Sequence, residues 1–124
     1  SIVIGQRLVR KICMKCREEK QLSEQEYSNL LQNVSEKVLK GNKRFFFGRG
    51  CEDCAGSGYK GRIVIHEVLV ADEEIREAIL RKASSTEMKQ IAIKNGMTTM
   101  IEDGFQKALL GITTVEEVLR VTHE

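Results

Sequence analysis

Residues 50–62 read Gly50-Cys51-Glu52-Asp53-Cys54-Ala55-Gly56-Ser57-Gly58-Tyr59-Lys60-Gly61-Arg62. They contain the second of two Cys-x-x-Cys pairs, and the first pair is Cys13 and Cys16. Two thiols separated by two residues can bind one metal ion from a tight turn, and two such turns make a closed four-sulfur site, the usual form of structural zinc. The sequence therefore predicts a structural Zn²⁺ site with the ligands Cys13, Cys16, Cys51 and Cys54. The alternatives are a redox dithiol, a disulfide pair or four unlinked core cysteines.

The glycines of this stretch also match the Gly-x-Gly-x-x-Gly pattern of dinucleotide-binding proteins, at Gly56, Gly58 and Gly61. That pattern binds a pyrophosphate only between a strand and the start of a helix. Here a cysteine turn precedes it and the β-branched run Ile63-Val64-Ile65 follows it. A phosphate-binding P-loop would require Lys-Ser/Thr where Arg62-Ile63 stands. We therefore do not predict a nucleotide site in this stretch.

The composition is that of a globular chain with an aliphatic core: 124 residues, 41% hydrophobic and 31% charged, with no Trp and no Pro. The apolar runs are too short for a membrane span or a signal-peptide core. Cysteines in a chain without an export signal belong to a reducing compartment, which favours metal binding over disulfides. Because the sequence opens at Ser1 without Met, we expect it to be a piece of a longer chain.

The formal charge of +2 is unevenly distributed. Residues 1–62 have 13 Lys/Arg and 7 Asp/Glu, a net of +6, whereas residues 63–124 have 7 and 11, a net of −4. One interpretation of the basic half is nucleic-acid binding. We favour the other, a solvated basic surface that also offsets the charge of zinc-bound thiolates.

Two strands are predicted on either side of the cysteines. Gln6–Ile12 is predicted as a strand, with a helix as the alternative, and Ile63–Val70 has β-branched residues on both faces. We expect the two to pair antiparallel as a stem whose far end is closed by the cysteines. His66 lies on the second strand, where four available thiols make it unnecessary as a ligand, so a structural or partly exposed His is expected.

The spacer between the cysteine pairs is predicted to be mostly one helix, Leu22–Lys40, with a Ser23–Glu26 capping box and a stop at Gly41. We expect its apolar stripe to pack on the metal lobe; the stripe is Tyr27, Leu30, Leu31, Val34 and Val38. Phe45-Phe46-Phe47 is predicted as a short strand. Its aromatic side chains are either core contacts or an exposed stacking or partner surface.

Residues 72–124 predict a bundle of short helices. Asp72 can cap the first helix, where Ile75, Ala78 and Ile79 are expected to face inward. Three capping boxes start the others, Ser84–Glu87, Thr99–Glu102 and Thr113–Glu116. Gly104 alone interrupts a predicted helix, either to let another backbone approach closely or because it is tolerated. Acidic residues such as Glu116-Glu117 are explained by the helix dipole, so no catalytic pair is predicted.

Four motifs, in order, resemble the C-terminal end of the secretion ATPases of the type II secretion and type IV pilus assembly family. The resemblance covers nearly the whole chain and is weakest in the spacer between Cys16 and Cys51. The motifs are Gln6-Arg7-Leu8-Val9-Arg10-Lys11-Ile12-Cys13-x-x-Cys16, Gly50-Cys51-x-x-Cys54-x-x-x-Gly58-Tyr59-Lys60-Gly61-Arg62, Gly96-Met97-Thr98-Thr99-Met100-x-x-Asp103-Gly104 and Gly111-Ile112-Thr113-Thr114-Val115-Glu116-Glu117-Val118-Leu119-Arg120-Val121-Thr122.

The resemblance implies a parent protein that is a cytoplasmic hexameric ATPase, peripheral at the inner membrane. Such a motor uses ATP and Mg²⁺ bound upstream of this piece, and drives pilin or pseudopilin assembly through a membrane platform protein. Its partners would be the upstream ATPase domains, neighbouring protomers and that platform or another cytoplasmic docking protein, with no nucleic acid expected. Retraction-type relatives lack the tetracysteine motif, so an assembly or secretion motor is implied. The metal ligands carry over as the four cysteines; no catalytic or cofactor-binding residue does.

We therefore predict an α+β fold, with a small zinc-stapled lobe on a two-stranded antiparallel stem, followed by a bundle of short helices. The predicted units are residues 1–12 as a strand at the end of a truncated motor domain, 13–60 as the tetracysteine subdomain, 61–71 as the return strand and 72–124 as the C-terminal helical subdomain. The alternatives are a nucleic-acid-binding zinc ribbon, a DnaJ-type chaperone zinc module and a thiol-disulfide enzyme.

Overall fold

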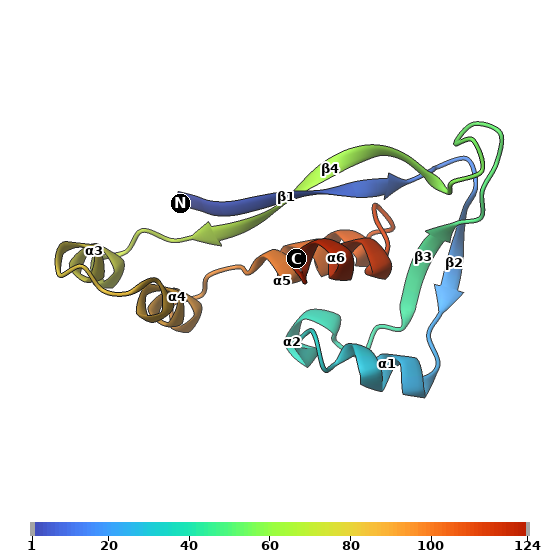
Figure 1. The fold of residues 1–124 in the computed structure, drawn as a ribbon. Coiled ribbons are helices and arrows are strands. Elements are labelled where there is room, and N and C mark those ends of the chain that lie inside the picture. Colours follow the sequence, from blue (N-terminus) through green and yellow to red (C-terminus); the bar gives the residue numbers. More distant parts are fainter. Residues whose placement is uncertain (1, 124) are drawn as a thin grey trace.

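A long two-stranded antiparallel ribbon is the backbone of the fold in the computed structural model, which describes residues 2–123 (Figure 1). Strand β1 (Ile2–Ile12) pairs with strand β4 (Tyr59–Leu69), with Leu8 opposite Val64 and Val9 opposite Ile63. The predicted stem is confirmed, and both strands are longer than predicted at their N-terminal ends. The α+β class is confirmed as well.

The ribbon buries only one of its faces. Val9 and Ile65 are fully buried there and form a cluster with Val121 of helix α6 (Val115–Thr122). Leu8, on the opposite face, is about half-exposed. This alternation is the strand period of two, and it fixes which face receives the helices.

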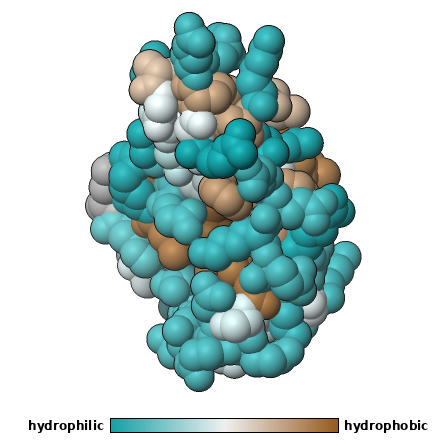
Figure 2. Space-filling model, turned by 90° about the vertical axis from the view of Figure 1, so that its right-hand side faces the viewer, coloured by the Kyte–Doolittle hydropathy of each residue, from teal (hydrophilic) through white to brown (hydrophobic). Residues whose placement is uncertain are grey.

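A second antiparallel hairpin lies beyond the cysteines and consists of β2 (Arg17–Gln21) and β3 (Arg44–Gly48) (Figure 1). The side of the molecule that carries it is largely hydrophilic, with hydrophobic atoms visible between the hydrophilic ones (Figure 2). Strand β2 was not predicted. All five of its side chains are exposed, so Arg-Glu-Glu-Lys-Gln carries no apolar alternation that could reveal a strand. Its conformation depends on pairing with the Phe-rich strand β3, a contact between residues far apart in the sequence.

The prediction of one helix over Leu22–Lys40 is wrong. The structure has two shorter helices, α1 (Glu24–Leu30) and α2 (Glu36–Leu39), separated by a turn. The Ser23–Glu26 capping box is present, but Ser35 provides a second N-cap within the segment, with its side chain accepting from the Lys37 N–H. A Ser side chain that binds nearby backbone competes with helix continuation, which explains the break.

The break also changes which residues face the core. Tyr27, Leu30 and Val34 are buried as predicted, whereas Leu31 is exposed and Leu39 is buried in its place. Their neighbours are the C-terminal helices and not the cysteines, which corrects the expected packing on the metal lobe. The buried residues of this core are Tyr27, Leu30, Val34, Leu39, Phe45, Phe105, Ala108 and Val118.

The three phenylalanines of β3 occupy three different environments. Phe45 is buried in this core. Phe46 is half-buried, with the guanidinium carbons of Arg17 and Arg44 each 5.1 Å from its ring centroid. Phe47 is exposed. The predicted core contact is confirmed for Phe45, whereas a stacking or partner surface at the exposed Phe47 stays a prediction.

Four helices follow the ribbon: α3 (Glu73–Leu80), α4 (Ser85–Lys94), α5 (Met100–Leu109) and α6. The predicted N-caps Asp72, Ser84 and Thr99 are confirmed, since each side chain accepts a backbone N–H of the first turn. Within residues 2–123, no helix combines the length and the apolarity needed to cross a membrane.

The cap of α6 is one residue later than predicted. Thr114, and not Thr113, accepts the backbone N–H of Glu117. The hydroxyl of Thr113 instead donates to the carbonyl of Arg10 at 2.7 Å, and both threonines are buried. Two adjacent threonines fit the capping pattern equally well, and the long-range contact with β1 decides between them.

The helices form two pairs along the ribbon (Figure 1). Helices α5 and α6 pack under its middle and against α1, α2 and β3, whereas α3 and α4 lie at the end near the N-terminus around a cluster of Leu69, Ile75, Ala92 and Met97. Ile75 and Ala78 face inward as predicted. Ile79 is 50% exposed, so its predicted inward position is wrong.

Gly104 of α5 permits close contact with α6, and the contact is with a side chain rather than with backbone. A Cβ atom at Gly104 would lie 2.6 Å from Cγ1 of Val118. We expect Gly104→Ala to destabilise the fold by about 1–3 kcal/mol through overpacking, although Ala is the better helix former. Urea unfolding measures the effect of Gly104→Ala in two backgrounds, the wild-type protein and the Val118→Ala variant. Equal destabilisation by Gly104→Ala in both backgrounds would contradict the steric explanation.

Candidate metal centre

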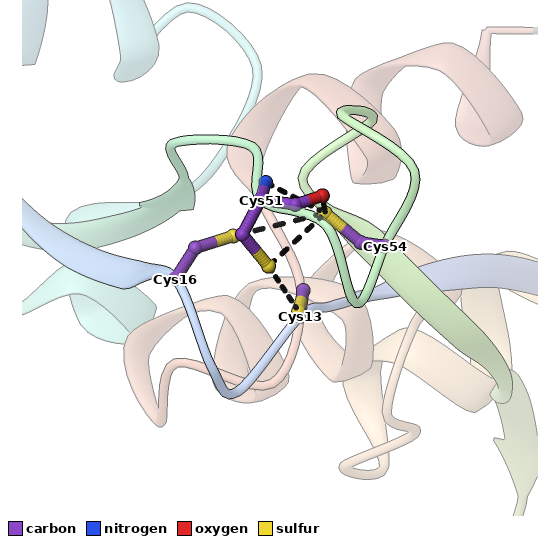
Figure 3. Close-up of side chains that lie close together, drawn as sticks. All are labelled: Cys13, Cys16, Cys51 and Cys54. Atoms are coloured by element: carbon purple, nitrogen blue, oxygen red, sulfur yellow. Dashed lines mark hydrogen bonds between the residues drawn. The ribbon is translucent and has the colours of Figure 1, made fainter.

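The four cysteines meet where the ribbon joins the β2–β3 hairpin (Figure 1). Cys13 and Cys16 lie in the turn between β1 and β2, and Cys51 and Cys54 lie in the connection between β3 and β4. Figure 3 shows the two pairs of side chains converging on one another from these two segments. All four Sγ atoms lie within 4.8 Å of one another. In residues 2–123, no other group of three or more His, Cys, Asp or Glu side chains has a metal-site arrangement.

The spacing of the sulfurs fits a tetrahedral metal ion. Four sulfurs at metal–sulfur distances of about 2.3 Å are separated by about 3.8 Å. The Sγ atoms of Cys13 and Cys51 are 3.7 Å apart, those of Cys51 and Cys54 are 3.7 Å apart, and those of Cys16 and Cys54 are 3.9 Å apart. These separations are far longer than a disulfide bond, and all four cysteines are free thiols. The residues present therefore fit a Cys₄ metal site.

Backbone N–H groups support two of the sulfurs. The Sγ of Cys54 accepts from the N–H of Cys51 at 3.3 Å and from that of Gly58 at 3.2 Å, and the Sγ of Cys16 accepts from the N–H of Gly50 at 3.2 Å. Such N–H···S hydrogen bonds orient metal ligands and stabilise thiolate charge. Cys13, Cys16 and Cys54 are buried, whereas Cys51 is partly exposed.

The surroundings shift the pKa values of the Cys16 and Cys54 thiols in opposite directions. Burial raises the pKa of the Cys16 thiol to about 11, although the Gly50 N–H acts in the opposite direction. Burial also opposes ionisation of Cys54, but the N–H groups of Cys51 and Gly58 and the thiols of Cys51 and Cys16 lower its pKa to about 6. The N–H groups therefore favour negative charge at Cys54, and the thiols lose their protons as they become metal ligands.

A close backbone contact holds the second turn in place. Gly58 accepts the N–H of Cys13 at 2.9 Å, and its φ of +81° is a left-handed conformation. A Cβ atom on Gly58 would lie 2.4 Å from the carbonyl oxygen of Gly48. Gly56 has the same φ of +81° but no atom within 4 Å of the corresponding position. Replacing Gly56 by Ala therefore adds backbone strain alone, whereas replacing Gly58 by Ala adds the same strain and a steric clash.

We expect Gly58→Ala to weaken zinc binding by at least about tenfold more than Gly56→Ala, since it forces Cys54 and Cys13 out of position. Competition with a chromophoric chelator measures both affinities. Equal affinities of the two variants would show that the contact with Gly48 has no part in the metal site.

Other residues considered from the sequence lie outside the quartet. His66 is half-buried on β4, where its backbone N–H donates to the Asp103 carboxylate at 2.8 Å. Gly61, the last glycine of the dinucleotide-like pattern, is within strand β4, so the pattern leads into a strand and not a helix. A Cys₄ quartet supplies four protein ligands and leaves no open position for a substrate water. The arrangement therefore suits a structural ion.

Sequence analysis missed a buried ion cluster three residues before Cys13. Glu117 of α6 is 1% exposed, and its carboxylate accepts the backbone N–H of Arg10 at 2.8 Å and the guanidinium groups of Arg10 and Arg120 at 3.0 Å. Arg10 also lies over the ring of Tyr59, 4.0 Å from its centroid. The cluster attaches α6 to the end of the ribbon that leads into the cysteine turns. Helical spacing with Val118 and Val121 places Glu117 on the buried face, and this signal could have identified it.

A protein-family model described as "Type II/IV secretion system protein" matches residues 1–120. The chain is 50% identical over 122 residues to the type IV pilus assembly ATPase PilB of Thermus thermophilus, covering 98% of this chain and 13% of that protein. It is 41% identical over 123 residues to the type II secretion system protein E of Xanthomonas campestris, covering 98% of this chain and 21% of that protein.

A further relative is the type IV pilus assembly ATPase TfpB of Acinetobacter baylyi, 33% identical over 119 residues that make up 96% of this chain and 20% of that protein. The chain thus spans about an eighth to a fifth of the length of these relatives. The family match extends over both cysteine pairs, the ribbon and nearly all of the C-terminal helices. The chain belongs to the Type II/IV secretion system protein family.

Proposed function

We propose that this chain is the C-terminal part of a hexameric assembly ATPase that powers type IV pilus assembly or type II secretion. The family match supports this proposal, together with relatives that are named as pilus assembly ATPases and as type II secretion proteins. ATP and Mg²⁺ would be bound by upstream domains. Residues 1–124 include no P-loop sequence, so we assign no catalytic residue within them.

Within such a motor, this piece would be a structural zinc module joined to a helical subdomain. The observation that carries this proposal is the sulfur quartet, whose separations of 3.7–3.9 Å match a tetrahedral ion. Bound Zn²⁺ would cross-link the end of β1 to the start of β4 through charge-stabilised thiolates. We assign residues 1–12 and 61–71 to the stem, 13–60 to the tetracysteine subdomain and 72–124 to the helical subdomain.

The proposed role of the zinc lobe is mechanical. A lobe held rigid by four metal–sulfur bonds can transmit a rotation between domains during ATP turnover, or can dock the motor on a partner. The partners we propose are the upstream ATPase domains, neighbouring protomers and an inner-membrane platform or cytoplasmic docking protein. The motor would then work on the cytoplasmic side, peripheral to the inner membrane.

The test is the double substitution Cys51→Ser and Cys54→Ser in the complete motor, with pilus assembly or secretion measured in cells. We expect loss of at least about tenfold in assembly, because two of four ligands are removed and the metal cannot be retained. Met14→Ser changes an exposed residue of the first cysteine turn that is not a ligand, and should assemble normally. Assembly at the normal rate by the double variant would overturn the proposed role of the zinc lobe.

A further inference from the structure

The four sulfurs of the metal centre are not equivalent. Cys54 accepts two backbone N–H groups and Cys16 accepts one, whereas in residues 2–123 no N–H group donates to the Sγ of Cys13 or Cys51. A hydrogen bond to a thiolate withdraws electron density from sulfur and lowers its reactivity toward electrophiles. Of the two sulfurs without such a bond, Cys13 is buried, 1% exposed, and only Cys51 is partly exposed. Reactivity and access therefore coincide at Cys51.

The charges around Cys51 provide a way to change its reactivity without replacing a cysteine. The Lys60 ammonium donates to the Asp53 carboxylate at 2.9 Å, and the pKa of Lys60 is raised by that bond first and, to a smaller extent, by the charges of Cys13 and Cys51. Lys60 is thus within electrostatic reach of both sulfurs that lack N–H donors. Lys15 acts on the same carboxylate, so two ammonium groups and one carboxylate share this surface. Metal-bound sulfurs are already thiolates, so a nearby ammonium group lowers their nucleophilicity, and the Asp53 carboxylate offsets the charge of Lys60.

We propose that Cys51 is the sulfur through which the metal centre reacts with electrophiles and peroxide, and that its oxidation opens the site. This inference rests on the proposed zinc occupancy. The Sγ atoms of Cys13 and Cys54 are both 3.7 Å from the Sγ of Cys51, so either can act as the second sulfur of a disulfide.

The oxidation proceeds in two steps. In the first, the Cys51 thiolate attacks one oxygen of hydrogen peroxide; the O–O bond breaks, hydroxide leaves and Cys51 becomes a sulfenic acid. In the second, the thiolate of Cys13 or Cys54 attacks that sulfur, an S–S bond forms and a second hydroxide leaves. Two thiolates have then lost two electrons in total, and the peroxide, with two protons, has become two water molecules. A quartet with only two remaining thiolates cannot hold its ion.

The first experiment treats the zinc-loaded protein with limiting iodoacetamide and identifies the labelled cysteine by peptide mass mapping, after native mass spectrometry has counted the bound zinc. We expect Cys51 to be labelled at least about tenfold faster than any other cysteine. Labelling that begins at Cys13, Cys16 or Cys54, or equally at all four, would overturn the inference. A protein that holds no zinc in the native spectrum would instead contradict the proposed function, which keeps the two failures distinct.

The second experiment changes the two surface charges next to Cys51 without touching a ligand. Lys60→Gln should accelerate the labelling of Cys51 by a factor of about 2–5, and Asp53→Asn should slow it by a similar factor, with Lys94→Gln on distant α4 as the control. Zinc release by hydrogen peroxide, followed with a chromophoric chelator, should change in the same order. The product should contain one disulfide that includes Cys51. A Cys13–Cys16 disulfide, or equal rates in all the proteins, would overturn the assignment.

Discussion

With zinc bound as proposed, its removal is expected to destabilise this protein more than any other single change. Apparent zinc-binding free energies at Cys-rich structural sites are on the order of 10 kcal/mol or more, and this energy contributes to folding. Without the ion, the two cysteine turns lose the contacts that hold the end of the ribbon together. We expect chelation to lower the midpoint of thermal unfolding by well over about 10 °C. Circular dichroism with and without chelator measures the shift, and native mass spectrometry counts the zinc.

The effect should be confined to the ligands. Cys16→Ser removes a buried sulfur that also accepts the Gly50 N–H, and should reproduce the effect of chelation. Met14→Ser, in the same turn, changes a side chain that is 66% exposed and should leave zinc content and unfolding temperature unchanged. Because α1, β3, α5 and α6 share a separate hydrophobic core, we expect the helices to survive chelation while the cysteine turns become sensitive to protease. An unfolding temperature independent of chelator would contradict a structural metal.

Glu117→Gln is expected to produce the largest loss of stability outside the metal centre, about 2–4 kcal/mol. The carboxylate accepts four N–H donors, three of them from two arginine side chains and one from the backbone of Arg10. The Gln side chain has only one acceptor oxygen, so its NH₂ group would face donors in a site that is 1% exposed. Urea unfolding measures the difference. Glu116→Gln is the matched control, since its side chain is exposed on the same helix.

The Glu117 carboxylate also makes the free energy of unfolding depend on pH in the acid range. Burial opposes its ionisation, but the side-chain hydrogen bonds of Arg120 and Arg10 and the Arg10 backbone N–H lower the pKa of Glu117 from 4.5 to about 2. A folded-state pKa below the unfolded one stabilises the protein above pH 4.5, and this contribution, about 3 kcal/mol, is lost as the pH falls from 4.5 toward 2. The free-energy difference between wild type and Glu117→Gln should therefore shrink over that range. A difference that stays constant would contradict a lowered pKa.

That comparison is made between two proteins at each pH because acid also protonates the cysteine ligands of both. The metal-linked loss is common to wild type and variant and cancels in the difference. Repeating the titration with chelator present in both samples checks that it cancels. A difference that appears only when zinc is present would assign the acid sensitivity to the metal centre and not to Glu117.

The parts of the fold predicted correctly are those with local signals. Two Cys-x-x-Cys pairs identify a four-sulfur site because two short turns can each supply two ligands, whatever lies between them. Ser23, Asp72, Ser84 and Thr99 identify helix starts because a cap binds backbone only two or three residues away. The pairing of β1 with β4 follows from two apolar strands that bring the cysteine pairs together.

The predictions that failed concern features that depend on contacts between residues far apart in the sequence. A helix over 22–40 fits an apolar stripe. The Ser35 cap breaks it locally, but contacts with a core that includes Phe105 and Val118 decide that Leu39 is buried. The sequence of strand β2 has no apolar alternation, and the strand forms by pairing with β3. These outcomes depend on packing free energy summed over segments far apart in the chain, which no local pattern contains.

The sequence by itself determined the meeting of the four cysteines, the ribbon and the positions of most helix caps, because each depends on residue type at short spacing. Only the tertiary structure decided that Thr114 and not Thr113 caps α6, and that Arg10 and Arg120 are the ion-pair partners of Glu117. It also decided that Cys51 is the accessible sulfur of the quartet. The physical reason is the same in all three cases. Burial and hydrogen-bond partners depend on the folded surroundings, so residues of the same type acquire different roles in different places.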